Sequence, residues 1–171
     1  MKVSLVAAIG QNRELGKNNE LLWHLHEDMQ FFKQITTGYY VVMGRKSFES
    51  IPPKYRPLPN RVNVIISRNP EYLYRECFTC GSISDAIDLA KESGETQIFI
   101  IGGGEIYRQA MESGIVDEMF LTHVQASFPD ADVHFPAYDQ YKWNKETIHS
   151  FQSDSRNEYA FDIVRYEKIP G

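Results

Sequence analysis

The feature that most constrains this chain is a set of short runs that are apolar at nearly every position. Residues 97–101, Gln-Ile-Phe-Ile-Ile, and residues 39–43, Tyr-Tyr-Val-Val-Met, are rich in β-branched and aromatic side chains. A strand that is apolar on both faces is typical of the interior of a parallel sheet. The predicted strands in the first two thirds of the chain are residues 3–9, 39–43, 62–67, 77–80 and 97–101.

Helical patterns separate these runs. The clearest begins with Ser82 and, three positions later, Asp85, which resembles a capping box, and Gly94 is placed to end it. The predicted helices are residues 25–36, 46–50, 82–93 and 105–113.

The pattern changes after Asp117. Residues 118–126, 143–151 and 159–167 carry strand-forming residues with no helix between them. The sequence therefore predicts an α/β fold, with residues 1–171 as a single domain. We expect a mixed, mainly parallel eight-stranded sheet with about four helices on its two faces.

The composition argues against several classes of function. The formal net charge of −5 disfavours nucleic acid or an anionic membrane as the main partner. No stretch approaches the roughly 20 apolar residues of a membrane span. The lack of such a stretch leads us to expect a cytoplasmic protein. Cys77 and Cys80 form one C-x-x-C pair without a second pair or a suitable histidine, so we expect no metal site. With no exposed apolar stripe left after the core is assigned, we expect a monomer.

One carboxylate lies on the wrong side of the first predicted helix. On a helical wheel, Met29, Phe32 and Ile35 share one arc with Leu25, and Asp28 falls between Phe32 and Ile35. An ionised carboxylate there needs a partner or costs a large desolvation free energy, and burial would raise its pKa. Asp28 could instead act only on the helix dipole or as a cap. We interpret it as a candidate ligand-binding residue.

A glycine run marks a candidate phosphate site. Gly102, Gly103 and Gly104 follow the strand at 97–101 and precede a helix, where backbone N–H groups can face an anion. The run is not the G-x-G-x-x-G fingerprint, and a tight strand-to-helix connection would also explain it.

Basic residues at a second junction support the same interpretation. Gly44, Arg45, Lys46 and Ser47 follow the strand at 39–43, and Arg68 follows Ser67 at the end of the next strand. Cations at a helix N-terminus oppose the helix dipole, which makes sense if an anion lies between them and the helix. Each cation alone could be solvated surface charge. Together the two junctions indicate a ligand with several phosphates, such as a dinucleotide with an extra phosphate.

The order of these pieces resembles one family over essentially the whole chain. The order is residues 3–9, Leu15-Gly16, Trp23 and Asp28, Met43-Gly44-Arg45, Pro57-Leu58-Pro59-Asn60-Arg61, residues 101–107, Leu121-Thr122-His123 and Asp132-Val-His-Phe-Pro136. The chain thereby resembles the dihydrofolate reductases. This resemblance implies NADPH-dependent reduction of 7,8-dihydrofolate to 5,6,7,8-tetrahydrofolate, which supports one-carbon and thymidylate metabolism. It also implies that dihydrofolate and folate analogues are the ligands.

The resemblance assigns roles around the substrate. Asp28 would accept hydrogen bonds from the pterin ring nitrogen and exocyclic amine, helped by Thr122, with Trp23 as a further catalytic residue. Asp28 would orient the pterin while water supplies the proton. Arg61 would clamp the glutamate tail, whereas nearby Arg56 is not distinguished from solvated charge. The implied substrate-binding residues are Val6, Ala8, Leu21, Asp28, Phe32, Ser50, Ile51, Leu58, Arg61, Ile101, Tyr107 and Thr122.

The resemblance also assigns the NADPH site. Arg45, Lys46 and Arg68 would help to hold the phosphates, including the 2′-phosphate that distinguishes NADPH from NADH. The peptide bond between Gly102 and Gly103 is expected to be cis, as in the family. The implied cofactor-binding residues are Ala8, Leu15, Gly16, Asn19, Gly44, Arg45, Lys46, Ser47, Ser67, Arg68, Gly81, Ile101, Gly102, Gly103, Gly104, Glu105, Ile106 and Tyr107.

One departure and two alternatives remain. Members of the family commonly carry proline before the tryptophan, whereas this chain has Leu22 before Trp23, so the conformation of that loop does not follow from the resemblance. A related NADPH-dependent reductase of riboflavin synthesis would need neither Asp28 nor Arg61. A non-catalytic folate- or nucleotide-binding module would not need to align two rings for hydride transfer.

Overall fold

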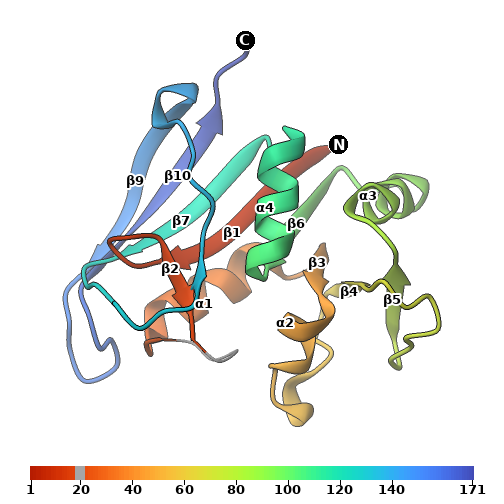
Figure 1. Ribbon diagram of the computed structural model, residues 1–171, viewed down its shortest axis with the longest axis horizontal. Helices are drawn as coiled ribbons and strands as arrows, with labels where there is room; N and C mark the ends of the chain where they lie inside the picture. The colour runs from red at the N-terminus through yellow and green to blue at the C-terminus, as the bar shows by residue number, and fades with distance from the viewer. Residues whose placement is uncertain (18–21) are drawn as a thin grey trace.

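An eight-stranded sheet organises the computed structural model, which describes residues 1–17 and 22–171. The strand order is β5-β4-β3-β6-β1-β7-β10-β9 (Figure 1). Neighbours from β5 to β7 are parallel, and β10 runs antiparallel to both β7 and β9. The strands are β1 (Lys2–Ile9), β3 (Tyr40–Gly44), β4 (Val62–Ile66), β5 (Cys77–Cys80), β6 (Gln97–Gly102), β7 (Glu118–Val124), β9 (Trp143–Phe151) and β10 (Phe161–Lys168). The predicted mixed, mainly parallel sheet is confirmed.

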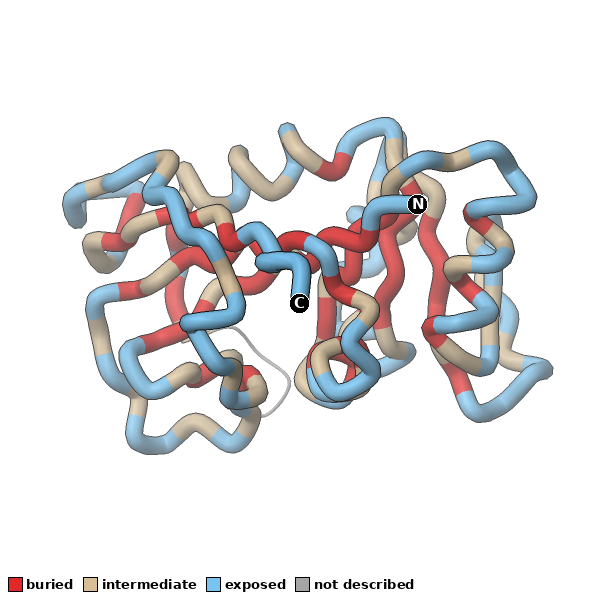
Figure 2. The backbone as a smooth tube through the Cα atoms, turned by 90° about the horizontal axis from the view of Figure 1, so that it is seen from above, coloured by how far each residue is buried: buried red, intermediate tan, exposed pale blue. Residues whose placement is uncertain are grey.

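Helices cover both faces of this sheet because its central strands are apolar on both sides. Val42 packs with α3 and α4 in one cluster, whereas its neighbours Val41 and Met43 pack with Phe48 on the opposite face, where α1 lies (Figure 1). The helices of the described chain are α1 (His26–Thr36), α2 (Arg45–Glu49), α3 (Ile83–Glu92) and α4 (Gly104–Ser113), with short 3-10 turns η1 (Pro53–Tyr55) and η2 (Gln140–Lys142). The buried residues, drawn in red in Figure 2, are concentrated in the central strands of the sheet.

The predicted helix starting at Ser82 is confirmed together with its cap. The Ser82 hydroxyl accepts a hydrogen bond from the Asp85 backbone N–H at 3.1 Å, and the helix itself spans Ile83–Glu92. The sequence did not predict a second, two-stranded sheet, in which β2 (Glu14–Gly16) pairs antiparallel with β8 (Val133–His134). Strands of three and two residues are too short to show a periodic pattern.

The start of α1 depends on a distant part of the chain. Leu25 occupies the N-cap position and its side chain makes no capping hydrogen bond. Instead, the Glu27 backbone N–H donates to Oδ1 of Asn157 at 3.2 Å, and the His26 N–H donates to the Arg156 carbonyl. Asn157 is only 1% exposed, so the loop between β9 and β10 fixes where α1 begins.

One helical-wheel assignment is wrong. Met29, placed on the apolar arc from the sequence, is 59% exposed. The face of α1 that packs on the protein runs from Phe31 through Ile35, Asp28 and Phe32 to the buried Thr36, and Met29 lies just beyond Thr36 at its edge. Asp28 therefore lies well inside the face that packs on the protein.

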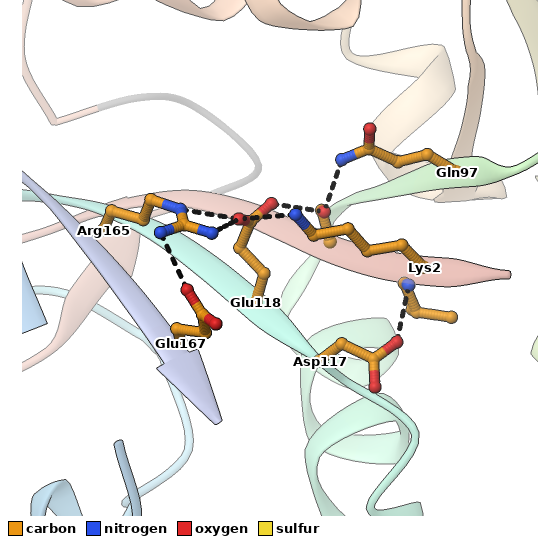
Figure 3. Close-up of polar contacts among 8 residues, drawn as sticks. Lys2, Gln97, Asp117, Glu118, Arg165 and Glu167 are labelled. Atoms are coloured by element: carbon orange, nitrogen blue, oxygen red, sulfur yellow. Dashed lines mark hydrogen bonds and ion pairs between the residues drawn. The ribbon is translucent and has the colours of Figure 1, made fainter. Parts of the chain in front are cut away.

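A buried ion-pair network joins β1, β7 and β10 at the amino end of β1, away from the predicted site. Glu118 is 2% exposed and accepts hydrogen bonds from Ser4 Oγ at 2.8 Å and Arg165 Nε at 2.6 Å, while Lys2 Nζ lies 3.0 Å from its Oε2 (Figure 3). Burial acts to raise the pKa of Glu118, but these donors together hold it below the ordinary value. The carboxylate therefore stabilises the fold in its ionised form.

We predict that Glu118→Gln lowers the free energy of unfolding by about 1–3 kcal/mol near neutral pH, because buried charged donors lose their partner. A carboxylate whose pKa is depressed by folding contributes above its unfolded pKa of about 4.3 and loses that contribution as pH falls through the folded value. Urea unfolding should therefore show the difference between variant and wild type narrowing in acid. The control is Glu167→Gln, which removes the exposed partner of Arg165 and should cost less than about 1 kcal/mol. Equal losses in both variants would contradict the assignment.

Candidate active site

A cleft of about 820 Å³ opens where the carboxyl ends of β1, β3, β4 and β6 meet. Ala8 comes from β1, Gly44 from the end of β3, Ile66 from β4, and Ile101 from β6. This is the edge of a parallel sheet at which ligands generally bind, because loops and helix N-termini converge there.

The cleft collects the residues that the sequence assigned to the cofactor. All of them line it except Asn19, which lies outside the described residues. Ser50, assigned to the substrate, also lines it. The sequence missed Ile66, Asn69, Gln109 and Val133. Asn69 follows Arg68 directly, whereas Val133 comes from β8 and belongs to the Asp132–Pro136 motif, to which the sequence assigned no ligand contact.

Basic side chains and closely packed glycines line the part of the cleft that we expect to bind phosphate. Arg45, Lys46 and Arg68 are exposed and line it, and the guanidinium of Arg45 lies 5.7 Å from the ring centre of Tyr72. At Gly104 a Cβ would lie 2.5 Å from Cγ1 of Val133, so no side chain fits there. Glycine at this position therefore lets Val133 of β8 pack closely against the start of α4.

The expected cis peptide bond between Gly102 and Gly103 is confirmed. It lies between β6 and the start of α4. Tyr107 packs against this turn, since a Cβ on Gly102 would lie 3.1 Å from its hydroxyl oxygen.

Glu105 also lines the cleft, but its charge is neutralised along α4. Its carboxylate accepts hydrogen bonds from Arg108 and Gln109, which lower its pKa to about 2. An anion in the cleft therefore faces a paired carboxylate and not a free one.

Asp28 lies beside this cleft and contacts the sheet. Its Oδ1 accepts a hydrogen bond from Thr122 Oγ1 on β7 at 2.5 Å, and Thr122 is the register partner of Ala8, a cleft residue on β1. Burial raises the pKa of Asp28 to about 6, although the hydrogen bond from Thr122 acts in the opposite direction.

The alternative that Asp28 merely caps α1 does not fit this geometry. The N-cap is Leu25, and the orphan N–H of Glu27 is satisfied by Asn157. The Glu27 side chain on the solvent side pairs with Arg156 at 3.0 Å. Asp28 is therefore a partly buried carboxylate that forms no ion pair with a described residue. A buried carboxylate with a raised pKa beside a cleft is typical of a ligand-binding group.

Four of the predicted substrate-wall residues lie in one cluster with Ile35 of α1, the helix that carries Asp28. Val6, Ile51, Leu58 and Ile101 are each partly buried against the cluster that contains Phe48, so each keeps an exposed edge. The Tyr107 hydroxyl lies within hydrogen-bonding distance of the carbonyls of Val6 and Ile101, at 2.6 and 2.8 Å. Leu21 lies outside the described residues.

Trp23 does not line the cleft. It is buried and packs on Phe128, with ring centres 5.2 Å apart, in a cluster with Leu25 and Phe161. Its catalytic role therefore stays a prediction.

The two arginines after α2 have different environments. The Cζ of Arg61 lies 5.8 Å from the ring centre of Phe32, and its NH1 donates to Thr36 Oγ1 at 3.2 Å. Arg56, which the sequence did not distinguish from solvated charge, donates from NH1 to the carbonyls of Glu49 and Ile51. Arg56 thus fixes the backbone at the end of α2, whereas Arg61 presents a half-buried guanidinium beside Phe32.

The remaining candidate groups suit structural roles. Cys77 and Cys80 are free, partly buried thiols in β5, and burial raises the pKa of both, that of Cys77 to about 11. The described residues contain no cluster of three or more histidine, cysteine or acidic side chains that could hold a metal ion. None of the helices in the described part of the chain has the length and apolar character needed to cross a membrane.

Comparison with known proteins identifies the family. Residues 2–168 match the family model described as dihydrofolate reductase. The chain belongs to the dihydrofolate reductase family. It is 36% identical over 166 residues to the dihydrofolate reductase of Bacillus subtilis (strain 168), covering 97% of this chain and 94% of that protein. It is 38% identical over 164 residues to the type 3 dihydrofolate reductase of Salmonella typhimurium, covering 96% of each.

A solved dihydrofolate reductase has the same fold. The enzyme from Enterococcus faecalis, complexed with NADP(H) and RAB-propyl, superposes with a TM-score of 0.87 at 28% identity, covering 99% of this chain and 97% of that one. The sheet and helices of this family member are therefore those of the family.

We predict that Thr122→Val raises the pKa of Asp28 above its value of about 6, because burial then acts without the opposing hydrogen bond. Following the Asp28 carboxyl carbon by NMR across a pH titration measures this directly. Thr122→Ser is the matched control, since it keeps a hydroxyl and should leave the pKa near the wild-type value. A valine variant that titrates like wild type would show that the hydrogen bond does not act on Asp28.

Proposed function

We propose that this chain reduces 7,8-dihydrofolate to 5,6,7,8-tetrahydrofolate with NADPH. The observation that carries the proposal is Asp28, a partly buried carboxylate held by Thr122 directly beside a cleft rich in phosphate-binding groups. Family membership supports the same activity. A reductase of riboflavin synthesis would have no need of this carboxylate, and a simple binding module would not need it next to the cofactor cleft.

Asp28 serves the reaction by orienting the pterin. Its pKa of about 6 leaves it mainly ionised at neutral pH, so it accepts hydrogen bonds from a ring N–H and an exocyclic amine. Thr122 fixes one carboxylate oxygen and thereby sets the direction of the other. Bound NADPH supplies the hydride, and the proton comes from water. The protein's contribution is alignment of the two rings and exclusion of bulk solvent.

The residues around the cleft divide between the two ligands. Arg45, Lys46 and Arg68, with Ser47 and Ser67, would bind the phosphates of the cofactor, and the glycine turn after β6 would hold its pyrophosphate. Val6, Phe32, Ile51 and Leu58 form the apolar wall of the folate pocket, and Arg61 pairs with the glutamate tail. The arrangement of these groups at one sheet edge supports each assignment.

We also propose that residues 1–171 act as one dihydrofolate reductase domain, as a cytoplasmic monomer that binds dihydrofolate and folate analogues. The family match over residues 2–168 supports the domain assignment. The net charge of −5 disfavours nucleic acid as a partner and so supports a protein that binds small ligands.

The purified chain should consume NADPH in the presence of dihydrofolate, followed as loss of absorbance of the reduced nicotinamide. Asp28→Asn should bind NADPH normally but lose turnover by about 100-fold or more near neutral pH, because the pterin loses its anionic partner. No turnover by the wild-type chain would refute the proposal. Wild-type rates in the asparagine variant would show that Asp28 only supports the fold.

The same variant has a second readout. Because folding raises the pKa of Asp28, its ionisation costs stability as pH rises from the unfolded value toward the folded one, and that cost persists above it. Asp28→Asn should therefore be more stable than wild type near neutral pH, by about 1–3 kcal/mol, with the gain vanishing in acid. An Asp28→Asn variant that is less stable than wild type at neutral pH would contradict the assigned free-energy cost of ionising the buried Asp28.

We predict that Arg45→Ala combined with Arg68→Ala reduces the preference for NADPH over NADH by about tenfold or more, since charge-assisted hydrogen bonds to the 2′-phosphate are lost. Steady-state kinetics with each cofactor gives the ratio, and the values with NADH should change little. Arg75→Ala is the control, because Arg75 is exposed but does not line the cleft. An unchanged ratio in the double variant would assign the 2′-phosphate to other groups.

A further inference from the structure

Glu14 is a buried carboxylate that the proposed reaction does not use. It is 1% exposed, lies in β2, and does not line the cleft. The ion pairs found among the described residues do not include it. A buried charge without a cation is costly unless hydrogen bonds replace its hydration, so its presence needs an explanation.

Backbone N–H groups from two distant segments bind this carboxylate. Oε1 accepts from the Asn12 N–H at 2.6 Å, and Oε2 accepts from the Phe128 N–H at 2.5 Å. Phe128 lies 114 residues further along the chain, in the segment that follows β7. Burial acts to raise the pKa of Glu14. Hydrogen bonds from the backbone N–H groups of Phe128, Glu14 itself and Asn12, together with the nearby charge of His134, outweigh burial and hold the pKa below its usual value.

The backbone is shaped around the carboxylate. At Gly10 a Cβ would lie 2.6 Å from Oε1 of Glu14, so the glycine leaves the space that the carboxylate occupies. The Gln11 N–H donates to the Ala126 carbonyl at 2.9 Å, and Ser127 Oγ donates to the side chain of Gln11 at 2.9 Å. Glu14 is therefore the buried centre of a junction between residues 10–14 and residues 126–128.

The chain leaves this junction directly into the cleft. Leu15 and Gly16 follow Glu14 and line the cofactor cleft. Leu15 reaches the start of α4, where its Cδ1 lies 3.9 Å from the Cβ position of Gly104. Pairing of β2 with β8 adds Val133 to the same wall. A shift of Glu14 would consequently move Leu15, Gly16 and Val133 in the wall of the cleft, while the eight-stranded sheet stays in place.

We propose that Glu14 is a positioning residue for the cofactor, which holds Leu15 and Gly16 in place by joining β2 to the segment after β7. The inference rests on the proposed use of NADPH and assigns Glu14 no contact with either ligand. A merely structural role would lower stability alone, whereas a positioning role weakens NADPH more than dihydrofolate. The two roles are separable because Asp28, Thr122 and the folate wall lie on other elements.

The test compares Glu14→Val and Glu14→Gln in the full chain, with NADPH and dihydrofolate dissociation constants measured separately by fluorescence titration. Glu14→Val should weaken NADPH by about tenfold while changing dihydrofolate by less than about twofold. Glu14→Gln keeps one acceptor oxygen and should lose less, which gives partial rescue if the valine variant folds poorly. In turnover, KM for NADPH should rise more than kcat falls.

Glu118→Gln provides the matched control. It removes a comparably buried carboxylate at the other end of β1 and should lower the melting temperature without changing NADPH affinity. Glu14 variants that lose stability but bind NADPH like wild type would overturn the inference, as would equal weakening of both ligands. A wild-type chain that fails to bind NADPH would instead refute the proposed function, and the inference with it.

Discussion

Parallel pairing of β3, β6, β1 and β7 is the constraint on which the rest of the molecule depends. Four neighbouring strands that run in one direction deliver their carboxyl ends to a single edge. There β3 supplies Gly44 and leads into Arg45 of α2, β6 leads into the glycine turn, β1 supplies Ala8, and β7 supplies Thr122 for Asp28. Because β10 runs antiparallel to β7, the sheet can end on that side without a further helix crossover.

Three buried or partly buried carboxylates show how one fold handles negative charge in different ways. Glu118 has a hydroxyl and two cationic side chains, and Glu14 has two backbone N–H groups; both have lowered pKa values. Asp28 has the Thr122 hydroxyl, which does not balance its burial, so its pKa is raised to about 6. The carboxylate with incomplete compensation is the one placed to gain a partner from a ligand.

Much of this arrangement could be predicted from local pattern. The strand at 97–101 with its glycine run, the cap at Ser82 and the anomalous position of Asp28 were all visible in the sequence and lie where expected. The resemblance to dihydrofolate reductases then joined the separate pieces into one site. The exposure of Met29, the burial of Trp23 and the backbone contacts of Arg56 did not follow, because each depends on how α1 and the neighbouring loops settle on the sheet.

The sequence by itself determined the number and order of most strands and helices, the family, and the residue types available to bind phosphate and pterin. Those properties depend on hydrophobic periodicity, glycine positions and motif order, which are written along the chain. Only the tertiary structure decided that Asn157 starts α1, that Val133 lines the cleft, and that Phe128 binds Glu14. The hydrogen bonds of Asn157 and Phe128 each join segments more than 100 residues apart. A single hydrogen bond between distant segments produces no hydrophobic periodicity in the sequence, so sequence patterns cannot predict it.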